Sequence, residues 1–176
     1  MEEKERYLFL DIDGVLNTMS YAMVAQWRYG SDTDEDGALF DPYAVENLQY
    51  IIDSIPVRIV ISSTWRLNGL NWMRWLWEKR CLPGEIYGIV PVLENVHFAN
   101  LEDGTNTSSV IPYGTRGLEI NEWLRINPRG SGVSYEYAII DDCDDFLTIQ
   151  SDHIVYTEPE TGLTKLIADK VLEILA

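Results

Sequence analysis

The sequence predicts a three-layer α/β fold in which a parallel sheet lies between layers of helices. Short apolar runs of strand length alternate along the chain with segments whose apolar residues recur at helical spacing. This alternation is typical of parallel strands joined by right-handed helical crossovers. Three of the apolar runs end in acidic or hydroxyl side chains. Folds of this class bind their ligands outside the carboxyl ends of the strands.

Two of the predicted strands lie in the first part of the chain. Residues 7–12 (YLFLDI) are a short apolar run that ends in Asp-x-Asp-Gly. They are interpreted as a buried strand that presents acids at its carboxyl end. Residues 57–61 (VRIVI) form a second apolar run, which stops at Ser62-Ser63-Thr64.

A helix is predicted between these two strands. Asp41 and Pro42 suit the N-cap and the first turn of a helix. The apolar residues that follow at helical spacing are Val45, Leu48, Ile51, Ile52 and Ile55. Residues 17–40, before this helix, have a mixed pattern, and their acidic, glycine-bounded stretch 30–37 is interpreted as a loop.

The alternation continues through the rest of the chain. Further helices are predicted over residues 69–80, 118–126 and 163–176. Further strands are predicted over residues 86–92, 135–140 and 154–156. The strand at 135–140 ends in Asp141 and Asp142, and residues 103–109 are interpreted as a loop. Because no linker divides the chain, we expect one domain over residues 1–176, with small insertions at about 17–40 and 84–115.

Composition and charge exclude several classes of protein. With 46% hydrophobic and 24% charged residues, the chain has the composition of a soluble globular protein. The 29 acidic residues outnumber the 13 basic ones, and the net charge of −16 argues against coating of duplex nucleic acid and against anionic membranes. Two cysteines and two histidines are too few for a disulfide framework or a structural zinc site. The charged N-terminus resembles no targeting signal, so we expect a cytoplasmic protein.

Side chains that follow the predicted strands are expected to meet at one edge of the sheet. These side chains are Asp11, Asp13, Ser62, Asp141 and Asp142. Carboxylates that lie close together repel each other and need a counter-ion. Oxygen ligands, combined with phosphate and water, suit Mg²⁺. The sequence therefore predicts a magnesium site at this edge.

The same residue types suit phosphoryl transfer. One carboxylate of the Asp-x-Asp pair can attack phosphorus and form an aspartyl-phosphate. The next carboxylate can protonate the leaving oxygen and then activate water. Gly14 lets the backbone approach the ligand closely, and the hydroxyl of Ser62 and neighbouring N–H groups can hold phosphoryl oxygens.

These motifs resemble those of the haloacid dehalogenase (HAD) superfamily of phosphatases. The resemblance lies in the Asp-x-Asp-Gly motif from Asp11 to Gly14, in the strand that ends at Ser62, and in the strand that ends at the pair Asp141-Asp142. More narrowly, the segments LDIDGVLN, VISSTWR, RGLEINEWL and IIDDCDD are similar to the HAD domain family of Swiss Army Knife RNA-repair proteins. The resemblance implies a Rossmann-like sheet with at most small cap insertions.

The resemblance also implies a role for each residue. Asp11 is expected to be the nucleophile and a Mg²⁺ ligand, and Asp13 the general acid/base, with its backbone carbonyl on the metal. Ser62, with Ser63 beside it, is expected to bind the phosphoryl group. Asp141 and Asp142 are expected to complete the metal site. The remaining motif needs a cation near the start of a helix, for which Arg116 is the best candidate and Arg66 and Arg74 are alternatives.

The predicted function is that of a Mg²⁺-dependent phosphohydrolase with an open site. Its substrate is expected to be a nucleotide, a nucleic-acid end or a phosphoprotein. One alternative is a receiver-like phospho-acceptor domain, but there the acidic pair follows the first strand, whereas here Asp-x-Asp comes first. Another is a catalytically silent HAD fold that acts as a binding module, against which the intact pair Asp11 and Asp13 argues.

Other conspicuous residues are given structural roles. Trp65, Trp72, Trp75 and Trp77 recur at helical spacing, and we interpret them as core residues in preference to a base-stacking surface. His97, His153 and Cys143 are likewise interpreted as structural, and Asp144 and Asp145 as supporting or exposed acids.

Overall fold

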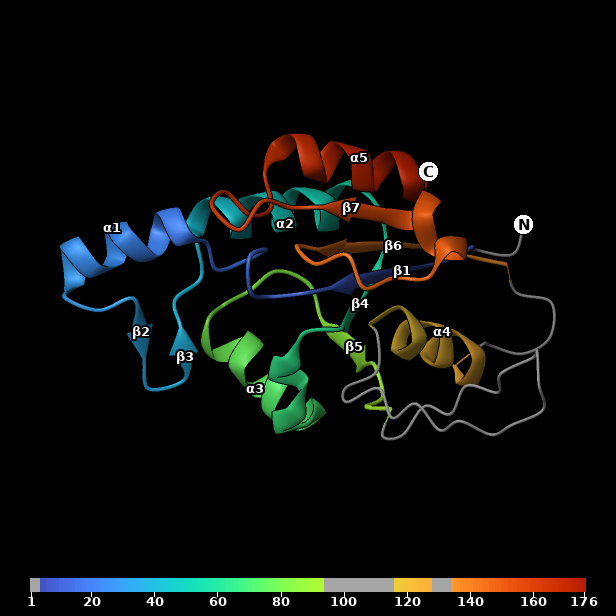
Figure 1. Cartoon of the computed structure of the whole chain (residues 1–176), viewed down its shortest axis with the longest axis horizontal. Helices are drawn as coiled ribbons and strands as arrows, with labels where there is room; N and C mark the ends of the chain where they lie inside the picture. Colours follow the sequence, from blue (N-terminus) through green and yellow to red (C-terminus); the bar gives the residue numbers. More distant parts are fainter. Residues whose placement is uncertain (1–3, 94–115, 128–133) are drawn as a thin grey trace, which may run out of the picture.

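A five-stranded parallel sheet forms the centre of the molecule (Figure 1). The computed structural model describes residues 4–93, 116–127 and 134–176, so the predicted loop at 103–109 and His97 lie outside the described residues. The strands are β1 (Glu5–Leu10), β4 (Arg58–Ile61), β5 (Ile86–Ile89), β6 (Tyr135–Asp141) and β7 (Ile154–Tyr156). Their order is β5-β4-β1-β6-β7, and every pairing is parallel. The predicted α/β fold class is confirmed.

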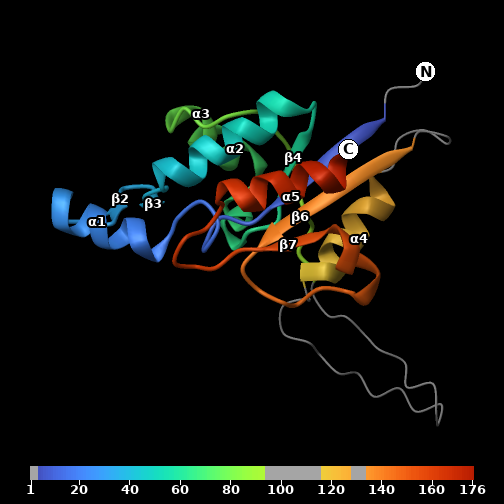
Figure 2. The same ribbon diagram turned by 90° about the horizontal axis from the view of Figure 1, so that it is seen from above.

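Helices cover both faces of this sheet, which gives the three predicted layers (Figure 2). The helices α2 (Pro42–Ser54), α3 (Leu70–Lys79) and α5 (Lys165–Leu175) pack on one face, and α4 (Arg116–Ile126) covers the other. Side chains alternate along β1, so that Leu8 and Leu10 face the first group while Tyr7 and Phe9 face α4. All four of these side chains are fully buried, because β1 is the central strand.

Capping side chains set the ends of two helices. Asp41 is the N-cap of α2, where its carboxylate accepts the Tyr43 N–H at 2.9 Å, as the Asp-Pro pair predicts. The final helix begins at Lys165 and not at residue 163, since the Thr164 hydroxyl accepts the N–H of Ile167 and acts as its N-cap. Leu163 belongs to the preceding turn, where it is fully buried.

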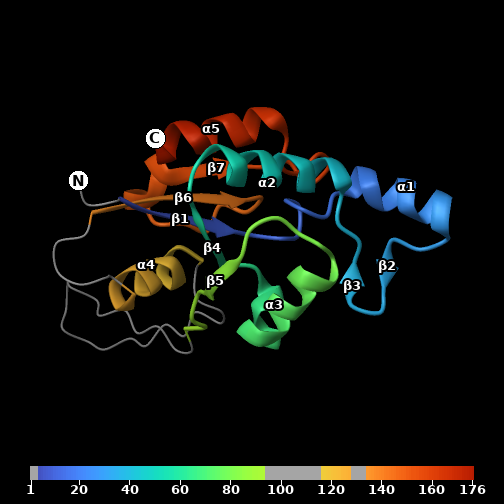
Figure 3. The same ribbon diagram turned by 180° about the vertical axis from the view of Figure 1, so that it is seen from behind.

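The segment between β1 and α2 holds regular structure that the mixed pattern of residues 17–40 does not predict. It contains α1 (Met19–Tyr29) and a hairpin of two short strands, β2 (Thr33–Asp34) and β3 (Gly37–Ala38). The loop assigned to residues 30–37 is therefore wrong in part. Helix α1 buries only Ala25 and so has no apolar face to detect. Figures 1 and 3 show α1 and the hairpin projecting past the carboxyl ends of the sheet strands.

Two short 3₁₀ helices, η1 (Thr64–Asn68) and η2 (Thr148–His153), complete the regular structure of the described residues. Helix η1 directly follows β4 and its serines, so it lies at the same edge of the sheet as the predicted site. No helix among the described residues has both the length and the apolar character needed to cross a membrane.

Candidate active site

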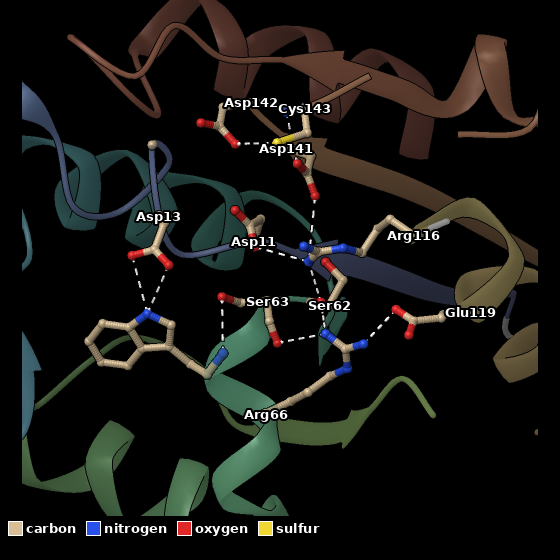
Figure 4. A network of polar contacts seen from close by, with 12 residues as sticks. Asp11, Asp13, Ser62, Ser63, Arg66, Arg116, Glu119, Asp141, Asp142 and Cys143 are labelled. Carbon is tan, nitrogen blue, oxygen red and sulfur yellow. Dashed lines mark hydrogen bonds and ion pairs between the residues drawn. The ribbon is translucent and has the colours of Figure 1, made fainter. Parts of the chain in front are cut away.

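Three adjacent strands deliver polar side chains to one point at the carboxyl edge of the sheet (Figure 4). Asp11 and Ser62 directly follow β1 and β4, and Asp141 is the last residue of β6. The sheet ladder continues through them, because the Asp11 N–H donates to the Ile140 carbonyl at 3.0 Å and the Ser62 N–H donates to the Leu10 carbonyl at 3.0 Å. The three side chains are buried, so their positions are set by the sheet.

Arg116, the first residue of α4, brings a guanidinium to this point. Its Nη1 lies 3.1 Å from Oδ1 of Asp11 and 3.8 Å from Oδ2 of Asp141, and it also donates to the Ser62 carbonyl. The start of α4 is held by Asp145, whose carboxylate accepts the Arg116 N–H at 3.0 Å. The structure thus places the predicted cation against the predicted nucleophile.

The two alternative arginines lie elsewhere. Arg74 donates from Nε to the Ile86 carbonyl at 3.0 Å and from Nη2 to the Tyr87 carbonyl at 3.2 Å, which ties α3 to β5. Arg66 is buried behind the site, where it donates from Nη1 to the carbonyls of Ser62 and Ser63 at 2.7 and 3.0 Å. Neither guanidinium has a contact with Asp11 comparable to that of Arg116 among the described residues.

A buried ion pair joins Arg66 to the helix that carries Arg116. Arg66 Nη2 lies 2.5 Å from Oε2 of Glu119, and both side chains are almost fully inaccessible to solvent. Burial raises the pKa of the Glu119 carboxyl and lowers that of the Arg66 guanidinium, while the charge of each partner opposes the shift of the other. Since Glu119 lies one helical turn after Arg116, this pair sets the position of α4 against the loop after β4.

Burial also dominates the electrostatics of the two central carboxyls. It raises the pKa of Asp11 to about 6, although the Arg116 guanidinium acts in the opposite direction. It raises the pKa of Asp141 to about 7, and the negative charge of Asp11 adds to this shift. One guanidinium therefore faces two buried acids, and further positive charge would favour the ionised form of both.

The donor atoms at this edge fit a hard cation such as Mg²⁺. Asp141, Asp142 and Cys143 present ligand atoms within 4.8 Å of one another, and Oδ2 of Asp141 is buried without a hydrogen bond from any described residue. Mg²⁺ is a hard cation that prefers oxygen ligands to sulfur, so the carboxylates of Asp141 and Asp142 are the donors in this group that suit it. Of the four predicted metal ligands, Asp11 and Asp13 are not members of this group among the described residues.

Gly14 allows the acidic pair to approach the Asp-x-Asp loop. Its φ is +71°, in the left-handed region that favours glycine. A Cβ at this position would lie 2.3 Å from Oδ2 of Asp142. The carbonyl of Gly14 accepts the Thr157 hydroxyl at 2.9 Å, which ties the loop to the end of β7.

Asp13 leaves the sheet and presents an exposed carboxylate beside the buried group. Its Oδ1 accepts the side-chain N–H of Asn17 at 2.6 Å. The indole Nε1–H of Trp65 donates to Oδ1 and Oδ2 at 3.2 and 3.1 Å. Asp11 is therefore buried next to a cation, while Asp13 is open to solvent and held by neutral donors (Figure 4).

The two serines after β4 differ in their surroundings. The Ser63 hydroxyl accepts the Trp65 N–H at 3.4 Å and so caps η1. The Ser62 hydroxyl is fully buried and has no hydrogen-bond partner among the described residues. A buried hydroxyl without a partner is costly, and a bound phosphoryl oxygen would satisfy it.

Sequence reasoning missed two residues that build the site, since Trp65 contacts Asp13 and Glu119 anchors α4. Asp145 supports the site by capping α4, which agrees with its interpretation as a supporting or exposed acid. For Trp65 a signal existed, since it lies only three residues after Ser62 in the same loop. The core interpretation of the tryptophans holds for Trp77, which is 3% exposed, but not for Trp75, which is 45% exposed.

Comparison with known protein families agrees with this geometry. The family model described as the HAD domain in Swiss Army Knife RNA repair proteins matches residues 7–167, which include every site residue named above. No curated protein and no solved structure matches the chain significantly. The match covers most of the chain and spans all five strands from Tyr7 onward. The chain belongs to the HAD domain family of Swiss Army Knife RNA repair proteins.

Proposed function

We propose that this chain is a Mg²⁺-dependent phosphomonoesterase that forms an aspartyl-phosphate on Asp11 and acts on a nucleic-acid end or a nucleotide. One observation carries the proposal. The Asp11 carboxylate lies at the carboxyl end of the central strand, 3.1 Å from the Arg116 guanidinium, beside the Ser62 hydroxyl, which has no hydrogen-bond partner among the described residues. A carboxylate nucleophile, a cation and a free hydroxyl donor are the groups that phosphoryl transfer needs.

In the first step an Asp11 carboxylate oxygen attacks the phosphorus of the bound monoester. The new bond joins Asp11 to phosphorus, and the bond from phosphorus to the ester oxygen breaks. The Ser62 hydroxyl donates to a phosphoryl oxygen, and the Arg116 guanidinium offsets the charge of the transferring group. Since both groups are fixed by the sheet and by α4, they need little rearrangement during the reaction.

Asp13 acts as the general acid in the first step and as the general base in the second step. In its protonated form it gives a proton from its carboxyl group to the leaving ester oxygen, which departs as an alcohol. It then accepts a proton from the water that attacks phosphorus. The bond between phosphorus and the Asp11 oxygen breaks, which restores the Asp11 carboxylate and releases inorganic phosphate. The exposure of the Asp13 carboxylate suits this exchange, and the donors Asn17 and Trp65 fix its position.

Asp11, Asp141 and Asp142, with the backbone carbonyl of Asp13, would hold the magnesium ion. The buried Oδ2 of Asp141 and the nearby carboxylate of Asp142 support this assignment. When bound, the ion supplies positive charge that offsets the negative charge of the phosphoryl group and of the acids around it.

The family and the charge together support a terminal phosphate as the substrate. The matching family takes its description from RNA repair, which favours a phosphorylated nucleic acid over a phosphoprotein. The net charge of −16 disfavours long contacts along a phosphate backbone. We therefore expect recognition of one terminal phosphate and its nucleoside, with weak affinity for the strand beyond.

Hydrolysis of an aryl phosphate tests the proposal most directly. Wild-type protein is expected to release phosphate only with Mg²⁺, and Asp11→Asn is expected to lose at least ~100-fold in turnover. Asp144→Asn, an exposed acid in the same region, serves as the matched control and should keep wild-type turnover. Equal turnover in wild type and Asp11→Asn would overturn the mechanism.

A further inference from the structure

A groove of about 590 Å³ is lined in part by Trp65, whose indole N–H donates to Asp13, and it lies outside the group of residues that would hold the phosphoryl group and the metal. Its lining comes from two separate parts of the chain. The region that follows β4 contributes Thr64, Trp65 and Trp72, and the β2–β3 hairpin contributes Glu35 and Asp36. Figures 1 and 3 show this hairpin and α3 next to each other at the same end of the molecule.

Trp65 links the groove to the candidate active site. The lining residue Thr64 follows Ser62 by two positions in the sequence. Trp65 lines the groove and also donates its indole N–H to both carboxylate oxygens of Asp13. A phosphoryl group held at Ser62 with its ester oxygen at Asp13 would therefore direct the rest of the substrate into this groove.

Aromatic rings form one wall of the groove. The rings of Trp65 and Trp72 lie 6.3 Å apart at an interplanar angle of 45°, and both side chains are partly accessible to solvent. Partly exposed indole rings offer planar surfaces on which a nucleobase can stack without regard to its identity.

Acidic side chains also line the groove. Glu35 and Asp36 line the groove, and no arginine or lysine is among the described residues that do so. Lys79 pairs with Oε1 of Glu35 at 2.6 Å and with Oδ2 of Asp36 at 2.5 Å, so it holds the acids in place without entering the groove. A ligand with a second phosphate would face these carboxylates.

The hairpin that carries the acids is fixed against the rest of the molecule. Arg80 donates to the Ala38 carbonyl at 2.7 Å and to Oδ1 of Asp34 at 2.8 Å. At Gly37 a Cβ would lie 2.9 Å from the Trp65 ring, so the hairpin backbone packs directly on this indole. The groove is thus built by interactions on both of its sides.

We propose that this groove holds the leaving group of the substrate and selects an uncharged aromatic leaving group, a nucleoside, over one that carries its own phosphate. Of the two proposed substrates, this selection favours the mononucleotide over the nucleic-acid end, whose leaving group carries phosphodiesters. The inference rests on the proposed phosphomonoesterase function and adds the part of the site that chooses the substrate. It assigns Trp72 as a stacking residue and Glu35 as a residue that repels additional phosphate.

Steady-state hydrolysis of three probes, AMP, ADP and glycerol phosphate, tests this assignment. Wild-type protein is expected to favour AMP over glycerol phosphate by about tenfold in kcat/KM, the size of one aromatic–base stack. It is expected to favour AMP over ADP by severalfold, because ADP brings a second phosphate to the acids that line the groove. In Trp72→Ala the ratio of kcat/KM for AMP to that for glycerol phosphate should fall about tenfold. This change should come from a higher KM for AMP. Trp27→Ala is the matched control, because Trp27 is an exposed tryptophan on α1 that does not line the groove, and its ratio should equal that of wild type.

A charge reversal gives an independent readout that does not depend on a tryptophan. Glu35 is 79% exposed, so Glu35→Lys is expected to fold, and it should raise kcat/KM for ADP relative to AMP by severalfold. An unchanged AMP-to-glycerol-phosphate ratio in Trp72→Ala, or an unchanged ADP-to-AMP ratio in Glu35→Lys, would overturn the assignment.

Binding separates this inference from the proposed function. Equilibrium binding of AMP to Asp11→Asn should weaken about tenfold when Trp72→Ala is added, whether or not phosphate is released. Failure of wild type to hydrolyse any probe would refute the phosphomonoesterase, whereas hydrolysis without any dependence on Trp72 in turnover and binding would refute the groove alone.

Discussion

The indole Nε1–H of Trp65 donates to the carboxylate of Asp13, with distances of 3.2 and 3.1 Å to the two oxygens. The ring that makes this contact is itself held, since it packs against Phe40 with centroids 5.5 Å apart and lies under the Arg80 guanidinium. A residue from the loop after β4 therefore orients an acid from the loop after β1. This contact joins the acid/base group to the groove where the leaving group is proposed to lie.

Trp65→Phe tests the orienting role of this contact. The substitution removes the N–H but keeps an aromatic ring against Phe40, so the fold should be retained. We expect kcat to fall by about tenfold, which corresponds to the loss of one hydrogen bond to a charged group. The measurement is phosphate release at saturating substrate, with Trp75→Phe as control. A Trp65→Phe variant with wild-type kcat would show that Asn17 alone suffices to orient Asp13.

Arg116→Ala tests the cation at the nucleophile. Arg116 is the only described guanidinium in contact with Asp11, and its removal leaves two buried acids without it. We expect phosphate release to fall at least ~100-fold, because a positioned donor at the transferring group is lost. Arg116→Lys should recover part of this loss, since it restores charge without the planar donor geometry. Wild-type turnover in Arg116→Ala would show that another cation stabilises the transferring phosphoryl group.

The main expected effect of Arg66→Ala is a loss of stability of the folded protein. The Arg66–Glu119 pair is buried, and removal of one partner leaves the other charge uncompensated, at a cost of about 3–5 kcal/mol in the free energy of unfolding. Denaturant unfolding of Arg66→Ala, Glu119→Gln and the double variant measures this cost. Losses that add independently in the double variant would contradict a direct coupling between the two side chains.

The strands, and three residues that directly end or follow them at the site, were predictable from local sequence. The central strands are buried on both faces, so their apolar runs are nearly continuous, and the residue after each run is placed by the parallel sheet. Asp11, Ser62 and Asp141 lie at these positions, which is why the predicted convergence is present in the structure.

The remaining parts depend on contacts between distant segments that no local pattern reveals. Helix α1 buries one residue, Ala25, so it lacks the apolar periodicity by which helices are detected. Glu119 meets Arg66 across 53 residues of sequence, and only the packing of α4 on the sheet brings them together. The acidic stretch 30–37 reads as a solvated loop, yet its carboxylates pair with Lys79 and Arg80 and form a wall beside Asp13.

Magnesium is expected to stabilise the folded protein whether or not a substrate is present. Asp11 and Asp141 are buried with a single guanidinium between them, and burial raises the pKa of both carboxyls, so the ionised pair destabilises the fold until more positive charge arrives. An ion that binds only the folded state raises the free energy of unfolding by about 2.7 kcal/mol when its concentration is one hundred times its Kd. Thermal unfolding of the wild type should therefore shift to a higher Tm as Mg²⁺ is added.

Two variants assign this shift to the site. Asp142→Asn removes a donor from the group formed with Asp141 and should reduce the Mg²⁺-dependent rise in Tm, whereas Asp144→Asn, exposed and outside that group, should keep it. The same titration with Na⁺ at matched ionic strength separates specific binding from screening of the overall charge of −16. A rise of equal size in Na⁺, or in Asp142→Asn, would place the effect on the acidic surface and contradict a magnesium site at the carboxyl edge of the sheet.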